Sequence, residues 1–202
     1  MSTVRELRSE FRFDPDLHEY SDSRGDVLPH ITGMLERTGW IDDTWYTDES
    51  CERGRVVHGA TADWDMGALD LETYVSKYRP WLLSYVGASR ILKPIHDAIE
   101  APAVHPTFRF GGRPDRRCRI YSIRTILEIK TNNKGWNLEK AHPIQTALQA
   151  ILVSATSPLP AEAWQRFALY CRPDGKFRLE DHQKTKRKDF AEAYRIIGVC
   201  CR

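Results

Sequence analysis

Residues 111–130, GGRPDRRCRIYSIRTILEIK, decide the fold that is expected for this chain of 202 residues. Residues 117–121 and 125–131 are candidate β-strands, and the two glycines that open the stretch are typical of a turn or bulge. Successive side chains of a strand point to opposite faces of the sheet. Glu128 and Lys130 therefore share one face, and the sequence predicts a carboxylate and an ammonium group side by side on it.

Asp115 lies thirteen positions before Glu128, a separation that one hairpin spans. Two carboxylates and the backbone carbonyl of Ile129 would hold a hard divalent cation, because Mg2+ prefers oxygen ligands. Lys130 would orient or help to deprotonate a water molecule, while the cation polarises a phosphoryl oxygen. Taken singly, a Glu-x-Lys on a strand is usually a solvated pair and an Asp after Pro is usually a turn residue. Together they predict metal-assisted phosphodiester hydrolysis.

The first hundred residues are expected to be mainly helical. Residues 9–31 predict a short hairpin, because Phe11 and Phe13 alternate with polar residues before a turn-rich segment. Residues 48–66 predict one helix, and residues 70–100 predict mostly helix with interruptions at Pro80 and Pro94.

The second half of the chain predicts strands between helices. Residues 104–112 predict a strand that runs into the two glycines, and residues 163–180 predict a hairpin. Pro143 is expected to begin an amphipathic helix, and a last helix is expected to stop at Gly198. Strands clustered between helices favour an α+β fold over a regularly alternating parallel sheet. The length indicates a single domain.

The pattern Pro114-Asp115, twelve residues, then Glu128-Ile129-Lys130 resembles the PD-(D/E)XK nuclease superfamily, and specifically its RecB-like and phage-type exonuclease branch. The stretch RGRVVH at 53–58 is similar to the RGxxxH motif of that branch, and GGRPD at 111–115 is similar to its GGxxD segment. The stretch QTALQ at 145–149 stands where the branch has QxxxY, with Gln149 in place of the Tyr. LPHITGML at 28–35 is similar to the PSVTGIL-like opening of phage-encoded members.

The resemblance implies a restriction-endonuclease-like α+β fold with a central mixed sheet flanked by helices. Residues 1–100 would form an N-terminal hairpin and helical cap, and residues 101–202 would form the catalytic core of the one domain. The implied ion is Mg2+ or Mn2+. No iron–sulfur cluster is expected, because only the adjacent Cys200 and Cys201 cluster near the C-terminus. The implied metal ligands are His58, Glu100, Asp115, Glu128 and the carbonyl of Ile129, and the implied catalytic residues are Asp115, Glu128, Lys130 and Gln145.

Nucleic-acid contacts are expected from Arg113, Arg116, Lys134, Trp136 and Gln149. Arginines crowd residues 109–119, where phosphate binding is one interpretation. Alternate positions of a strand cannot all face one groove, so some of these arginines are expected to be solvated. A Trp in a loop can stack on unpaired bases or serve as a packing lid. The basic run at 184–188 is interpreted as a solvated face, with a DNA-backbone patch as the alternative.

The leading expectation is a metal-dependent deoxyribonuclease, an exonuclease that acts on single-stranded or duplex DNA ends in recombination, repair or phage replication. A recombination or replication protein is a further expected partner. One alternative is a catalytically silent nucleic-acid-binding or assembly module of the same fold. Another is a structure-selective or RNA-directed endonuclease, because loops rather than metal ligands choose the scissile bond. Polarity of cleavage and oligomeric state stay open.

Composition excludes several classes of protein. Hydrophobic residues make up 41% and charged residues 29%, which is ordinary for a globular chain. No apolar run approaches the roughly 20 residues of a membrane helix, and MSTVRELRSEFRFD lacks the apolar core of a secretory signal. Five cysteines without a CxxC motif predict reduced thiols, hence the cytoplasm of a bacterial or phage-infected host cell. A net charge of +2 does not by itself indicate a nucleic-acid partner.

Overall fold

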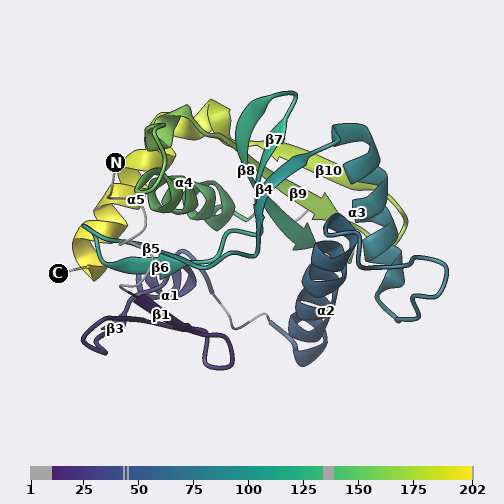
Figure 1. The fold of residues 1–202 in the computed structure, drawn as a ribbon, viewed down its shortest axis with the longest axis horizontal. Coiled ribbons are helices and arrows are strands. Elements are labelled where there is room, and N and C mark those ends of the chain that lie inside the picture. The colour runs from purple at the N-terminus through teal and green to yellow at the C-terminus, as the bar shows by residue number, and fades with distance from the viewer. Residues whose placement is uncertain (1–10, 43, 45, 134–138, 202) are drawn as a thin grey trace, which may run out of the picture.

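The computed structural model describes residues 11–42, 44, 46–133 and 139–201. Its centre is a five-stranded sheet in the order β10-β9-β8-β7-β4 (Figure 1). The β8–β9 pair is parallel and the other three pairs are antiparallel, so the sheet is mixed. The strands are β4 (Ile95–Ile99), β7 (Arg116–Ile120), β8 (Ile123–Thr131), β9 (Gln165–Cys171) and β10 (Phe177–Asp181). Helices flank this sheet, which confirms the expected α+β class.

Different helices cover the two faces of the sheet. On one face Ile126 of β8 packs among apolar residues of α4 (Ala141–Ser154) and α5 (Lys186–Cys200). On the other face Leu127 and Ile129 pack with Tyr85 of α3 (Arg79–Leu92). The helix α4 also connects β8 to β9, and such a crossover is what a parallel pair of strands requires.

The helix α2 (Asp48–Asp65) packs on α3 and begins at a capping box. The hydroxyl of Thr47 accepts a hydrogen bond from the backbone N–H of Ser50 at 3.1 Å, and the Ser50 hydroxyl accepts one from the Thr47 N–H at 2.9 Å. The predicted helix over residues 48–66 is therefore confirmed. Within the described ranges no helix is both long and apolar enough to cross a membrane.

Two small sheets lie beside the central one. β1 (Phe11–Asp14), β2 (Glu19–Asp22) and β3 (Val27–Leu28) form an antiparallel three-stranded sheet, called here the N-terminal sheet, and α1 (Ile31–Arg37) follows it. β5 (Ala103–His105) pairs with β6 (Phe110–Gly112). The N-terminal sheet packs closely on β6, because a Cβ atom on Gly111 would lie 2.2 Å from the ring of Tyr20.

Several predicted boundaries are wrong. Residues 9–31 contain a third strand rather than one hairpin, and residues 104–112 hold two strands separated by a turn. Residues 95–99 are strand rather than helix, and Pro80 lies in the first turn of α3 instead of interrupting a helix. Gly198 lies inside α5, which continues to Cys200. The predicted hairpin at 163–180 is confirmed as β9 and β10, with the short 3-10 helices Ala161–Ala163 and His182–Thr185 on either side.

Candidate metal centre

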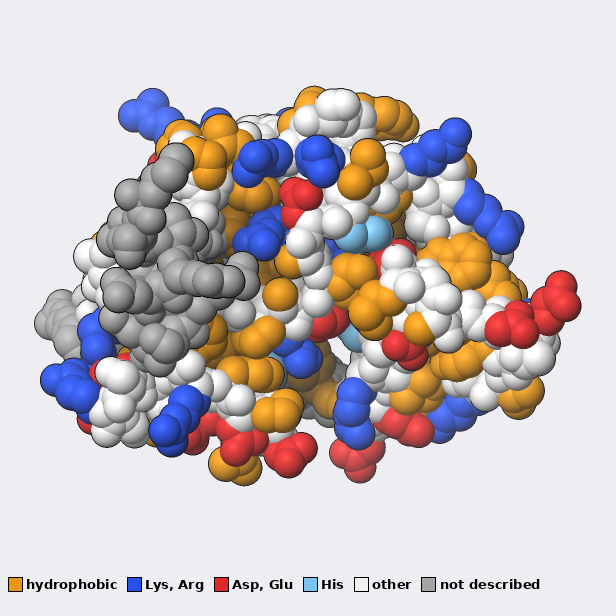
Figure 2. All heavy atoms as spheres, in the orientation of Figure 1, with side chains coloured by type: hydrophobic (Ala, Val, Ile, Leu, Met, Phe, Trp, Pro, Cys, Tyr) orange, Lys and Arg blue, Asp and Glu red, His pale blue; other side chains and the backbone are white. Residues whose placement is uncertain are grey.

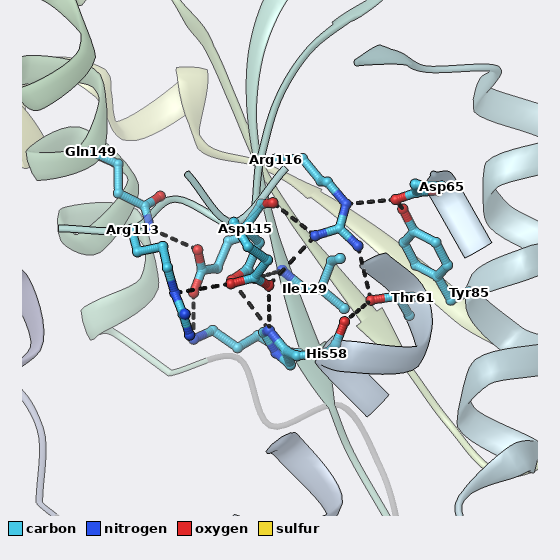
Figure 3. A network of polar contacts seen from close by, with 12 residues as sticks. His58, Thr61, Asp65, Tyr85, Arg113, Asp115, Arg116, Ile129 and Gln149 are labelled. Atoms are coloured by element: carbon cyan, nitrogen blue, oxygen red, sulfur yellow. Dashed lines mark hydrogen bonds and ion pairs between the residues drawn. The ribbon is translucent and has the colours of Figure 1, made fainter. Parts of the chain in front are cut away.

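Three segments that are far apart in the sequence bring together an imidazole and two carboxylates. His58 comes from α2, Glu100 follows β4 and Asp115 precedes β7. One ligand atom from each of these residues lies within 4.8 Å of the other two. The Nδ1 atom of His58 is 3.2 Å from Oδ1 of Asp115 and 3.5 Å from Oε1 of Glu100. Figure 3 shows the imidazole of His58 turned toward the Asp115 carboxylate.

The backbone at Glu100 holds its carboxylate at this place. Glu100 has a φ of 47°, a left-handed conformation that is uncommon for residues other than Gly, Asn and Asp. Its N–H donates a hydrogen bond to the carbonyl of Asp115 at 3.0 Å, which ties the end of β4 to the start of β7. Sterically disfavoured backbone of this kind is concentrated at functional sites.

Arg116 joins the same strands to α2. Its Nη1 atom donates to the Asp115 carbonyl at 2.7 Å, and its Nη2 atom donates to Oγ1 of Thr61 at 3.0 Å. It also forms an ion pair with Asp65 of α2 (Figure 3). The Arg116 side chain is completely buried, so the prediction that it contacts nucleic acid is wrong. The position of Arg116 at the start of a strand gave no sign of this burial. The one available signal is its ion-pair partner Asp65, which follows His58 by seven residues and therefore lies on the same face of α2.

The register of β7 and β8 brings the second predicted acid to the same place. Arg116, the first residue of β7, lies opposite Leu127, and continuing this register by one residue would place Asp115 opposite Glu128. Oδ2 of Asp115 accepts a hydrogen bond from the N–H of Ile129 at 2.7 Å. Since the N–H and C=O groups of one strand residue point to the same edge, the Ile129 carbonyl also points to the β7 edge of β8.

Two amides of α4 and one ammonium group hold Glu128. Nε2 of Gln145 and Nε2 of Gln149 donate to its two carboxylate oxygens, each at 2.7 Å. Nζ of Lys130 lies 2.9 Å from Oε1 of Glu128 and donates to Oε1 of Gln145 at 3.1 Å. Glu128 is 3% exposed and is not one of the residues in the His58 cluster. Gln149 is also 3% exposed and faces Glu128, so it positions this carboxylate and its predicted nucleic-acid contact is wrong.

Charges within the site set the protonation of its basic groups. Burial alone would lower the pKa of His58, but the carboxylates of Asp115 and Glu100 outweigh burial and raise this pKa to about 10. Burial opposes the charge of Lys130 in the same way, and the Glu128 and Asp115 carboxylates raise its pKa. At neutral pH Lys130 therefore stays an ammonium, which donates hydrogen bonds and does not accept a proton.

The donor set fits a hard divalent ion. Oε1 of Glu100 is buried without a hydrogen-bond partner among the described residues, although His58 and Arg116 lie at ion-pair distance. Carboxylate and carbonyl oxygens suit Mg2+ and Mn2+, and an imidazole suits a transition metal. His58, Glu100, Asp115 and the Ile129 carbonyl are thus the groups that could hold such an ion, with Glu128 beside them.

Space for solvent adjoins these residues. A cavity of about 40 Å³ lies between the start of α1, the end of β6 and α4, and His18, His30, Arg113, Gln145 and Gln149 are among its lining residues. A volume of this size holds a few water molecules. The molecular surface is hollowed between the N-terminal sheet and α2 (Figure 2).

The remaining predicted contacts have different outcomes. Nε of Arg113 lies 3.2 Å from Oε2 of Glu100, and its guanidinium lies over the Phe13 ring at 5.8 Å. Arg113 is partly exposed and borders the cavity. Lys134 and Trp136 lie outside the described residues. In the basic run Lys184, Arg187 and Lys188 are exposed, in agreement with the interpretation as a solvated face.

Comparisons with known proteins give no family and no function for this chain. The chain matches no family model and no curated protein sequence. One solved structure, described as "Crystal structure of SSO0001", is 16% identical in sequence and aligns over 82% of this chain and 84% of that chain. The TM-score of 0.34 is too low to carry an argument about fold or function.

Proposed function

We propose that this chain is a divalent-metal-dependent nuclease that hydrolyses phosphodiester bonds of DNA on a restriction-endonuclease-like fold. The observation that carries the proposal is the convergence of His58, Glu100 and Asp115 within 4.8 Å, where Asp115 also accepts a hydrogen bond from the N–H of Ile129, the neighbour of Glu128. The proposal agrees with the resemblance of the sequence to the PD-(D/E)XK superfamily.

The chemistry divides between the ion and the side chains. When bound, a Mg2+ or Mn2+ ion polarises a phosphoryl oxygen and makes a water molecule more acidic. His58, Glu100 and Asp115 would hold the ion, and their two carboxylates offset its charge. Lys130 stays protonated and donates hydrogen bonds to the attacking water or to the phosphate. Gln145 and Gln149 contact Glu128 rather than the reacting atoms, so they act as positioning residues.

Burial of the acids favours an enzyme over a module that only binds nucleic acid. Asp115 is 5% exposed, and burying carboxylates costs free energy unless partners or a cation compensate for it. A binding surface needs exposed cations and has no need for buried acids beside a lysine. The preference for an exonuclease that acts on DNA ends, and for roles in recombination, repair or phage replication, is supported by the sequence resemblance alone.

Cleavage of linear and circular DNA with Mg2+, with Mn2+ and with EDTA tests the proposal. The wild type is expected to degrade linear DNA only with a divalent ion, and Glu128→Gln and Asp115→Asn are each expected to lower the rate at least 100-fold. Glu162→Gln changes an exposed carboxylate outside the site and should leave the rate unchanged. Thermal melting shows whether each variant is folded. A folded Glu128→Gln protein with full activity, or a wild type inactive with every ion, contradicts the proposal.

A further inference from the structure

Three arginines form a row on the sheet face that carries the acids. In the register of β7 and β8, Arg117 lies opposite Ile126 and Arg119 lies opposite Arg124. Residues two apart on a strand share a face, so these arginines follow Asp115 and Glu128 toward the end of the hairpin. The helix α4 covers this face beside Glu128 and ends at Ser154, which leaves the hairpin end of the face uncovered.

A groove of about 1170 Å³ runs along this face and passes beside the candidate centre, although none of the clustered residues themselves line it. Pro114 and Ala101 line it, and each is the sequence neighbour of one of the clustered acids, Asp115 and Glu100. Arg117 and Arg124 line the groove farther along. Figure 2 shows Lys and Arg side chains gathered at the upper edge of the molecule, where Figure 1 places the β7–β8 hairpin.

The positive charge of this row is largely uncompensated. Arg119 has an ion pair with Asp97 at 3.3 Å. For Arg117 and Arg124, no carboxylate in the described part of the chain lies within ion-pair distance. Like charges directly opposite each other on neighbouring strands are destabilising. A polyanion bound in the groove would remove this repulsion, and the phosphates of a nucleic acid are such charges.

The opposite wall of the groove suits unpaired bases. It includes the half-buried side chains of Phe11 in the N-terminal sheet and Val104 in β5. Aromatic and apolar side chains beside a cationic track are the usual features of sites for single strands, because bases stack on them without regard to sequence. In a duplex the faces of the bases are already stacked on one another, so they are not free to stack on these apolar side chains.

We infer that this groove binds a single polynucleotide strand, with Arg117 and Arg124 on its phosphates and the apolar wall on its bases, and guides it to the metal centre. The inference depends on the proposed nuclease function and deepens it by assigning the path of the substrate. Single-stranded DNA and single-stranded RNA both present a phosphodiester backbone and unpaired bases, so either could occupy the groove.

Binding of fluorescein-labelled dT12 and rU12 in EDTA tests the path without any cleavage. Each phosphate contact to a single strand contributes about 0.7 to the slope of log Kobs against log salt concentration. The double variant Arg117→Gln/Arg124→Gln should therefore lower the slope by about 1.4 and weaken binding roughly 10- to 30-fold at 0.1 M salt. Arg117→Lys/Arg124→Lys should restore the slope, because a point charge is enough for a phosphate.

Lys184→Gln/Arg187→Gln is the matched control, since it removes the same charge from exposed residues that do not line the groove. It should change neither the slope nor the affinity. An equal loss in both double variants, no binding of dT12 or rU12 by the wild type, or tighter binding of a 12-base-pair duplex through the same arginines would each overturn the inference. Retained arginine-dependent binding without cleavage under any ion would instead contradict only the nuclease function.

Discussion

Binding of a divalent ion at the candidate centre is expected to release one proton from His58. In the metal-free protein the pKa of His58 is about 10, because the carboxylates of Asp115 and Glu100 outweigh the effect of burial. An imidazole coordinates a metal only in its neutral form, so the ion must displace the proton. Between pH 7 and pH 8 nearly one proton should therefore leave for each ion bound.

The size of this coupling follows from the distance between the pKa and the working pH. The pKa of His58 lies about three units above pH 7, so removing its proton at pH 7 costs about 4 kcal/mol, which lowers the apparent affinity for the ion. The apparent association constant for Mn2+ should rise about tenfold from pH 7 to pH 8. A site made of carboxylates alone would show almost no change in this range, because such groups titrate near pH 4.

Isothermal titration of Mn2+ into the protein, in two buffers of different ionisation enthalpy at one pH, counts the protons directly. His58→Gln should reduce the count to near zero, with a weaker site. His105→Gln is the control, because burial lowers the pKa of His105 and leaves it neutral at this pH. A wild-type count near zero, or an unchanged count in His58→Gln, would refute the assignment of His58 as a ligand.

Three predictions concern stability. Gly111→Ala should lower the free energy of unfolding by about 2 kcal/mol, because the new methyl group would clash with the Tyr20 ring. In the double variant with Tyr20→Ala, most of the cost of the clash should disappear. Asp189→Ala should cost about 3–5 kcal/mol, because it leaves the fully buried Arg166 without the carboxylate that lies 2.9 Å away. Burial, followed by the charge of Arg166, lowers the pKa of His182 to about 3. The unfolded chain therefore binds more protons below pH 6.5, so stability falls as pH falls from about 6.5 toward 3, by about 2 kcal/mol at pH 5.

Urea denaturation measures all three. Additive effects of Gly111→Ala and Tyr20→Ala would argue against their contact. Removing Glu192 from its more exposed ion pair with Arg195 is expected to lower the free energy of unfolding by less than about 1 kcal/mol. A loss as small as this in Asp189→Ala would contradict the proposed role of the buried ion pair. His182→Gln should flatten the acid limb of the stability curve, and an unchanged limb would show that other groups control it.

The central strands and α4 could be predicted from the sequence, because their apolar periodicity is regular. The strand β4 could not be predicted. A bulge between His96 and Ala98 breaks its alternation, so Ile95, Ala98 and Ile99 stand at the spacing of a helix. Gly198 inside α5 shows that the packing of a helix can offset the roughly 1 kcal/mol that glycine costs in its interior.

The candidate site was only partly accessible to sequence reasoning. The spacing of Asp115 and Glu128 predicted a hairpin, and the antiparallel pair β7–β8, with Asp115 directly before β7 and hydrogen-bonded to Ile129, confirms that part of the expectation. The closest cluster, however, joins Asp115 to His58 and Glu100, which only the resemblance suggested. The burial of Arg116 was not predictable, because it depends on Asp65 and Thr61, which lie 51 and 55 residues earlier in the chain.

Neighbouring faces of the helix α4 contact the candidate site and the apolar core. Gln145 and Gln149 fix the Glu128 carboxylate, while Leu148 and Ile151 of the same helix belong to the apolar core. A small rotation of the helix after a conservative core substitution would move both amides before it unfolded the protein. In a random-mutagenesis screen, inactive but well-expressed clones should therefore accumulate along this one segment, far more than along α5.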